Sequence, residues 1–130
     1  MAGRALVDSS FFIGSLRSGR DPLKELSVHS DDWELLTCGV VQVEVLRGMK
    51  HEKAHRRMAD FIGCMLYVPT LNVVWERVAA LAWELDRIGR TMQVTDLIIA
   101  CCALEHEAAV LTFDSDFENV PNLRAISALD

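Results

Sequence analysis

Short apolar runs alternate with longer segments of helical periodicity along the whole chain, and this alternation restricts the fold more than any other feature. Strands are expected near residues 5–8, 35–38, 66–68, 109–111 and 123–126, with helices between them. Such alternation is typical of parallel β-α units, whose helices cover the faces of a sheet. The sequence therefore predicts an α/β fold built on a short, mostly parallel sheet.

Capping residues predict where several of the helices begin. Ser9 or Ser10 can cap a first helix that runs to about Arg17, and Pro22 suits the first turn of a second. Further helices are expected over 39–48 and 51–65. The longest helix is expected over 72–88, with a broad apolar face made of Val74, Trp75, Val78, Leu81, Ala82 and Leu85. Thr95 is expected to cap a last helix. Its residues 97–104 carry no charge, which predicts a central, buried position.

The length of 130 residues fits one domain, 1–130, with a sizeable core. No apolar run reaches the roughly 18 residues that a membrane-spanning helix needs. The N-terminal residues lead at once into the first expected strand, so no signal peptide is visible. The cysteines form no CxxC motif, which favours reduced core thiols in a cytoplasmic protein; they are Cys38, Cys64, Cys101 and Cys102.

Acidic residues lie where the apolar elements begin or end. Asp8 and Asp114 follow expected strands, Asp116 comes two residues later, and Asp96 opens the uncharged helix. Each Asp taken singly fits a helix cap or a turn, but that reading does not explain Glu44, which lies within a helix. Carboxylates are rarely buried without a partner, and ligands of parallel sheets bind at the carboxyl ends of the strands. Such oxygen ligands predict a site for Mg²⁺ or Mn²⁺.

Positive charge is concentrated next to the Glu44 segment. Residues 47–57 carry five basic side chains and one acid, a local charge of +4, which leaves −10 on the rest of a chain whose net charge is −6. A basic stripe beside an acidic cluster suits a metal-dependent enzyme that acts on a phosphate polymer. The alternative is a solvated helix face, as most charge runs are.

Four segments that contain these acids together resemble the PIN-domain ribonucleases, and the VapC-type toxins of toxin–antitoxin pairs in particular. The segments are Val7-Asp8-Ser9-Ser10, Val41-Gln42-Val43-Glu44-Val45-Leu46-Arg47-Gly48, Thr95-Asp96-Leu97-Ile98-Ile99-Ala100 and Leu111-Thr112-Phe113-Asp114-Ser115-Asp116-Phe117. They occur in the order of the family and span the chain. One departure is Ser9, because the family often has Thr at this position.

The resemblance implies a three-layer α/β/α fold, PIN-like, and a metal-dependent endoribonuclease that is the toxin of a type II toxin–antitoxin system. It implies one or two Mg²⁺ or Mn²⁺ ions held by Asp8, Glu44, Asp96 and Asp114, with Asp116 as a direct or water-mediated ligand. Ser10 and Thr112 match positions that orient the carboxylates. The basic residues expected to contact the RNA backbone are Arg47, Lys50 and Lys53.

The resemblance also implies two protein partners, a second copy of the chain and a small antitoxin that shields the site. The long helix around Trp75 and the pair Phe11-Phe12 offer apolar surface for such contacts. Two other functions stay open. The chain could be a PIN-like scaffold that binds a partner without catalysis. The motif His51-Glu52-Lys53-Ala54-His55 also matches the HExxH signature of zinc hydrolases, although charged neighbours argue against a core zinc helix.

Overall fold

The computed structural model describes residues 3–130 and builds one parallel sheet with β1 at its centre. The strands are β1 (Gly3–Val7), β2 (Trp33–Cys38), β3 (Leu66–Val68), β4 (Ala109–Leu111) and β5 (Ala125–Ile126). Their order is β3-β2-β1-β4-β5, and every neighbouring pair is parallel. The predicted fold class is therefore confirmed.

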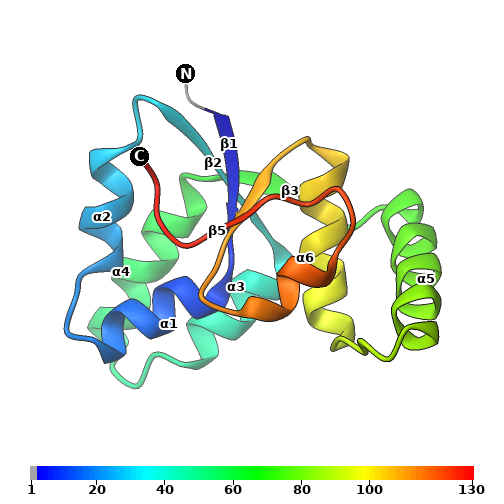
Figure 1. The fold of residues 1–130 in the computed structure, drawn as a ribbon. Helices are drawn as coiled ribbons and strands as arrows, with labels where there is room; N and C mark the ends of the chain where they lie inside the picture. The colour runs from blue at the N-terminus through cyan, green and yellow to red at the C-terminus, as the bar shows by residue number, and fades with distance from the viewer. Residues whose placement is uncertain (1–2) are drawn as a thin grey trace.

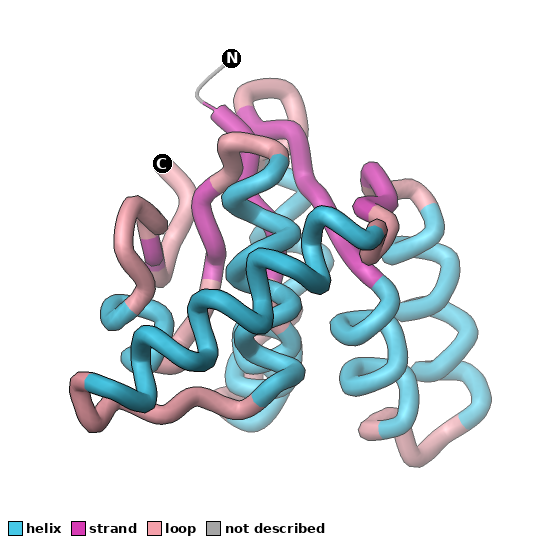
Figure 2. The backbone as a smooth tube through the Cα atoms, turned by 90° about the vertical axis from the view of Figure 1, so that its right-hand side faces the viewer, coloured by secondary structure: helices cyan, strands magenta, loops and turns pink. Residues whose placement is uncertain are grey.

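Helices cover both faces of this sheet. They are α1 (Ser9–Arg17), α2 (Pro22–Val28), α3 (Gly39–Arg47), α4 (Glu52–Gly63), α5 (Asn72–Arg87) and α6 (Val94–Glu105), with a short 3₁₀ helix, η1 (Ser115–Asn119). Figure 1 shows α1, α2 and α4 on one side of β1 and α6 and α5 on the other. In Figure 2, α5 crosses outside α6 as the outermost helix. Within residues 3–130, none of the helices combines the length and apolar character that crossing a membrane requires.

The core joins β1 and β4 to the uncharged part of α6, residues 97–104. Every residue of α6 from 97 to 103 is buried, as its lack of charge predicts. Phe12 of α1 and Phe117 of η1 are fully buried on the same core. Because α6 is apolar on all sides, it can lie between the sheet and α5, which leaves α5 to face solvent with its polar side.

Two predicted helix caps are wrong. The N-cap of α1 is Asp8 and not Ser9 or Ser10, because the β-strand conformation continues through Asp8 (φ −74°, ψ 153°). Helix α6 begins earlier than predicted, so Gln93 is its N-cap and Thr95 lies exposed inside its first turn. Met92, the residue before this cap, is 94% buried and fixes the chain where it enters the helix.

The predicted exposure of several apolar side chains also needs correction. Phe11 and Phe12 lie in the core, so they offer no free apolar surface. Trp75 was expected on the buried face of the longest helix but is 48% exposed. The four cysteines are free thiols, as predicted, but Cys64 is exposed at the end of α4.

Candidate metal centre at the carboxyl edge of the sheet

The sheet brings the scattered acids to one edge. Asp8 directly follows β1 and Asp114 follows β4, and these two strands are parallel neighbours with Val7 opposite Leu111. Helix α3 starts at the end of β2 and carries Glu44, while Asp96 lies in the first turn of α6. These elements meet below the lower ends of the strands in Figure 1. This is the edge at which parallel sheets bind their ligands.

Asp8 is a buried carboxylate that is held through only one of its oxygens. The residue is 2% exposed, and its Oδ2 accepts hydrogen bonds from Ser10 Oγ at 2.7 Å and from Thr112 Oγ1 at 2.8 Å. Its Oδ1 is buried without a hydrogen-bond partner among the described residues. A buried anionic oxygen without a donor is costly, so this oxygen is suited to a cation.

The same two hydroxyl groups tie the loop that follows β4 to Asp8. Ser10 Oγ accepts from the backbone N–H of Phe113 at 3.0 Å, and Thr112 Oγ1 accepts from that of Asp114 at 2.9 Å. Asp114 then accepts from the backbone N–H of Asp116 through Oδ1, also at 2.9 Å. The position of Asp114 is therefore coupled to that of Asp8, although the two residues are 106 positions apart in the sequence.

Glu44 is connected to the start of α1 by a hydrogen bond that the sequence reasoning missed. Ser9 Oγ donates to Glu44 Oε1 at 3.1 Å. Ser9 and Ser10 are adjacent at the start of a helix, where consecutive side chains point in directions about 100° apart. Their hydroxyls therefore serve different acids, Ser10 binding Asp8 and Ser9 binding Glu44. The Ser-Ser pair after Asp8 is the available signal, but the sequence predicts an orienting role for Ser10 alone and only a possible helix cap for Ser9.

Asp96 experiences the charge of all the other acids. Its pKa is raised to about 6, first by burial and then by the charges of Asp8, Asp114, Glu44 and Asp116, in that order. The five acids therefore share one electrostatic environment, in which each additional negative charge is harder to hold. Asp116 is exposed and contributes least, so it lies at the rim of the group.

This crowding predicts that Asp96 destabilises the metal-free protein. An unfolded Asp ionises near 3.8, so the cost of its ionisation in the fold is absent below that pH and complete above about 6. At about pH 8 in EDTA, we expect Asp96→Asn to raise the free energy of unfolding by about 1–2 kcal/mol, because partial exposure screens the full shift. At about pH 4 the gain should largely vanish. Urea unfolding at the two pH values measures both.

Asp21 offers a control, because the fold lowers the pKa of this carboxyl whereas it raises that of Asp96. It caps α2, and the hydrogen bond from Arg57 holds the pKa of its carboxyl below the usual value. Ionised Asp21 is thus favoured by the fold, and Asp21→Asn should not stabilise the protein at about pH 8. If Asp96→Asn gained no stability at high pH, the repulsion between Asp96 and the other acids would be weaker than the structure indicates.

The donor set fits a hard divalent cation. Within residues 3–130, no three His, Cys, Asp or Glu side chains are close enough to ligate a single ion directly. Mg²⁺ keeps several waters and is commonly held through one or two carboxylates, so a looser ring of acids is compatible with it. The free Oδ1 of Asp8 and the mutual repulsion at Asp96 both favour a cation at this edge.

The basic residues and the HExxH motif lie outside the acidic group. Arg47 ends α3 and Lys53 lies in the first turn of α4, with Lys50 in the connection between them, and all three are exposed. His51 and His55 are also exposed, and they are not part of any group of three possible metal ligands in the described chain. Glu52 pairs with Arg56 at 3.3 Å. The HExxH reading therefore lacks the buried three-ligand set of a zinc hydrolase.

Known proteins share the sequence or the fold of this chain over most of its length. The model of the PIN domain family matches residues 5–123. Two relatives from Mycobacterium tuberculosis are each 29% identical to the chain. The match with ribonuclease VapC21 covers 92% of this chain and 88% of the relative. The match with ribonuclease VapC4 covers 95% of this chain and 96% of the relative. The solved structure of VapBC2 from Rickettsia felis, bound to a DNA fragment from its promoter, superimposes with a TM-score of 0.79 over 98% of this chain and 99% of that one at 18% identity.

Proposed function

This chain belongs to the PIN domain family, and on that premise we propose that it is a Mg²⁺- or Mn²⁺-dependent endoribonuclease, the toxin of a type II toxin–antitoxin system. The observation that carries the proposal is the buried Asp8 carboxylate, fixed through Oδ2 and free at Oδ1, within a group of five acids. The two relatives of matching length are both named ribonucleases. The proposal treats residues 1–130 as one PIN-like domain.

The residues of this chain have distinct parts in the proposed reaction. The residues that would hold one or two divalent ions are Asp8, Glu44, Asp96 and Asp114, and Asp116 would assist from the rim. When bound, such an ion lowers the pKa of a water and neutralises charge on the phosphodiester. Ser10 and Thr112 hold Oδ2 of Asp8, which would leave Oδ1 available to a cation, and Ser9 holds Oε1 of Glu44.

The basic residues supply the attraction for RNA in this proposal. Arg47, Lys50 and Lys53 follow Glu44 along the chain and are exposed, so they can meet phosphate groups near the acids. Neutralising phosphates releases counterions, and the resulting affinity falls as salt rises. An acidic chain with a net charge of −6 depends on such a local patch to approach RNA.

The test is cleavage of a mixed RNA pool by the purified protein with Mn²⁺ or Mg²⁺, beside EDTA, over a series of salt concentrations. We expect cleavage with metal, none with EDTA, and a salt slope that falls when Arg47, Lys50 and Lys53 are replaced together by Ala. A folded protein that cuts no RNA with either metal would instead support the catalytically inactive scaffold. An unchanged salt slope in the triple variant would remove the basic residues from the RNA surface.

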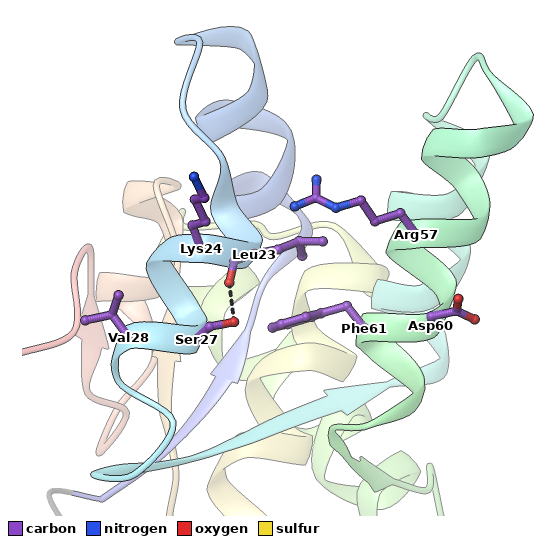
Figure 3. A pocket seen from close by; sticks show the side chains of 7 residues that line it. All are labelled: Leu23, Lys24, Ser27, Val28, Arg57, Asp60 and Phe61. Atoms are coloured by element: carbon purple, nitrogen blue, oxygen red, sulfur yellow. Dashed lines mark hydrogen bonds between the residues drawn. The ribbon is translucent and has the colours of Figure 1, made fainter.

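We propose a small antitoxin and a second copy of the chain as partners. A cavity of about 750 Å³ between α2 and α4 supports the first, because its lining includes the apolar side chains of Leu23, Val28 and Phe61. Figure 3 shows Leu23 and Phe61 pointing toward each other across it, with Lys24 and Arg57 above. Val28 is 77% exposed. An apolar antitoxin segment would cover this surface.

Exposed Trp75 and Trp83 on α5 support the dimer. We also propose that the protein acts in the cytoplasm, where an RNA substrate and an antitoxin would both be available.

A further inference from the structure

Phe113 is an exposed aromatic side chain between two residues of the acidic site. It lies between Thr112 and Asp114, and 41% of its surface is exposed. Its backbone N–H donates to Ser10 Oγ at 3.0 Å, so the residue is fixed to the hydroxyl that also binds Asp8. Its ring centroid lies 5.3 Å from that of Phe11. The ring is therefore held at the edge of the site rather than free in solvent.

A close approach of α1 determines where this ring can lie. A Cβ at Gly14 would stand 2.6 Å from Cδ2 of Phe113, nearer than real atoms pack. The backbone of Gly14 is ordinary helix, so the contact with the ring, and not the backbone conformation, requires glycine here. The guanidinium of Arg20 lies 5.6 Å from the ring centroid and adds a cation–π contact. The ring position is thus built by three separate segments.

Phe113 also lines a small cavity that adjoins the acidic group at Asp114. This cavity has a volume of about 250 Å³, and its lining consists of Thr112, Phe113, Asp114, Ser115, Glu118, Ala125, Ile126 and Ser127. Sites for whole small-molecule ligands measure roughly 300–1,000 Å³, so this one suits a single ring system. The lining residues are one aromatic residue, two aliphatic residues, and several residues that carry hydroxyl or carboxylate groups.

We propose that this cavity is a nucleobase subsite, in which an unpaired base of the RNA stacks against Phe113 while its phosphate lies at the acids. The inference rests on the proposed function, because it assigns a place to one base of the same substrate. Proteins that act on unpaired RNA stack bases on aromatic rings and bind the base edges through polar side chains. Glu118 and the hydroxyls of Ser115 and Ser127 supply polar groups for that edge.

The charge of the cavity selects a base over a phosphate. Asp114 and Glu118 both line it, and neither forms an ion pair with a basic residue of the described chain. A phosphate would be repelled by these two carboxylates, whereas a base is neutral and carries N–H donors that carboxylates accept. The basic residues proposed to meet phosphate lie elsewhere, on α3, on α4 and in the connection between these helices.

A double-mutant cycle between the protein and the RNA tests this subsite. Binding of a short single-stranded RNA is measured in EDTA by fluorescence anisotropy, with an abasic nucleotide placed at each position in turn. For the wild-type protein, we expect one abasic position to weaken binding by about 5- to 100-fold. For Phe113→Leu, normal RNA should bind weakly, and the same abasic position should cost almost nothing. Phe113→Trp should restore the sensitivity to the missing base.

Glycine variants separate the position of the ring from its chemistry. Gly14→Ala displaces the ring but keeps it, and we expect binding to fall as for Phe113→Leu. Gly63→Ala is the matched control, because a Cβ there meets no atom within 4 Å at the end of α4. An abasic penalty that is equal in wild type and Phe113→Leu, or RNA binding too weak to detect, overturns the subsite. Because binding is read without metal, failure of metal-dependent cleavage is a separate result that concerns the proposed function alone.

Discussion

Asp8→Asn is expected to reduce metal-dependent RNA cleavage by more than about 100-fold. Loss of a residue that only hydrogen-bonds a metal ligand costs roughly 10- to 100-fold, and loss of the ligand itself should cost more. The substitution removes the negative charge and replaces one carboxylate oxygen by an amide nitrogen that cannot bind a cation. Oδ1 of Asp8 is buried without a hydrogen-bond partner in the described chain, so it is the oxygen of this carboxylate that is available to a cation. Single-turnover cleavage with Mn²⁺, together with the Mn²⁺ affinity from calorimetry, measures the effect.

The fold should tolerate this change, which makes the result interpretable. Asn caps helices about as well as Asp does, so α1 should keep its N-cap. Asp21→Asn is the matched control, because Asp21 also caps a helix by accepting a hydrogen bond from the second residue after it. It lies outside the acidic group and should leave cleavage unchanged. Equal activity of Asp8→Asn and wild type would exclude Asp8 as a metal ligand.

Thr112→Val is expected to lower cleavage and Mn²⁺ affinity by about 10- to 100-fold while leaving every acid in place. The hydroxyl of Thr112 donates to Asp8 Oδ2 and accepts from the backbone N–H of Asp114. Its loss leaves Asp8 with only the Ser10 donors and leaves the Asp114 N–H without its acceptor. Because Thr112 is 5% exposed, the unpaired groups should also cost about 1–3 kcal/mol of stability, which thermal unfolding measures.

Thr37 supplies a control for the change from hydroxyl to methyl. It is fully buried on β2, and its Oγ1 has no hydrogen-bond partner among the described residues. Thr37→Val therefore removes no hydrogen bond and should leave stability unchanged or increase it. Its cleavage should stay at the wild-type level. If both valine variants lost activity to the same extent, the effect would belong to core packing and not to the orientation of Asp8.

Much of the fold could be predicted because its signals are local. The uncharged run 97–104 predicted a buried helix, and Gly39 and Pro22 were placed correctly at helix starts. Caps were less predictable, because the choice between Asp8 and Ser9 depends on where the strand conformation ends. The exposure of Trp75 was also misjudged, since helical periodicity marks an apolar face without fixing how much of it the neighbouring helix covers.

The candidate acids could be identified from the sequence, because Glu44 lies within a helix, where a cap or turn does not explain it, and because the four acidic segments together resemble one family. What the acids do to one another came only from the tertiary structure. The hydrogen bond from Thr112 to Asp8 joins residues 104 positions apart, and the Phe113 ring is positioned by a glycine on another helix. A sequence determines residue types and local periodicity. Long-range packing decides which oxygen of Asp8 lacks a hydrogen-bond partner and which aromatic residue lines a cavity. No local sequence pattern contains this information.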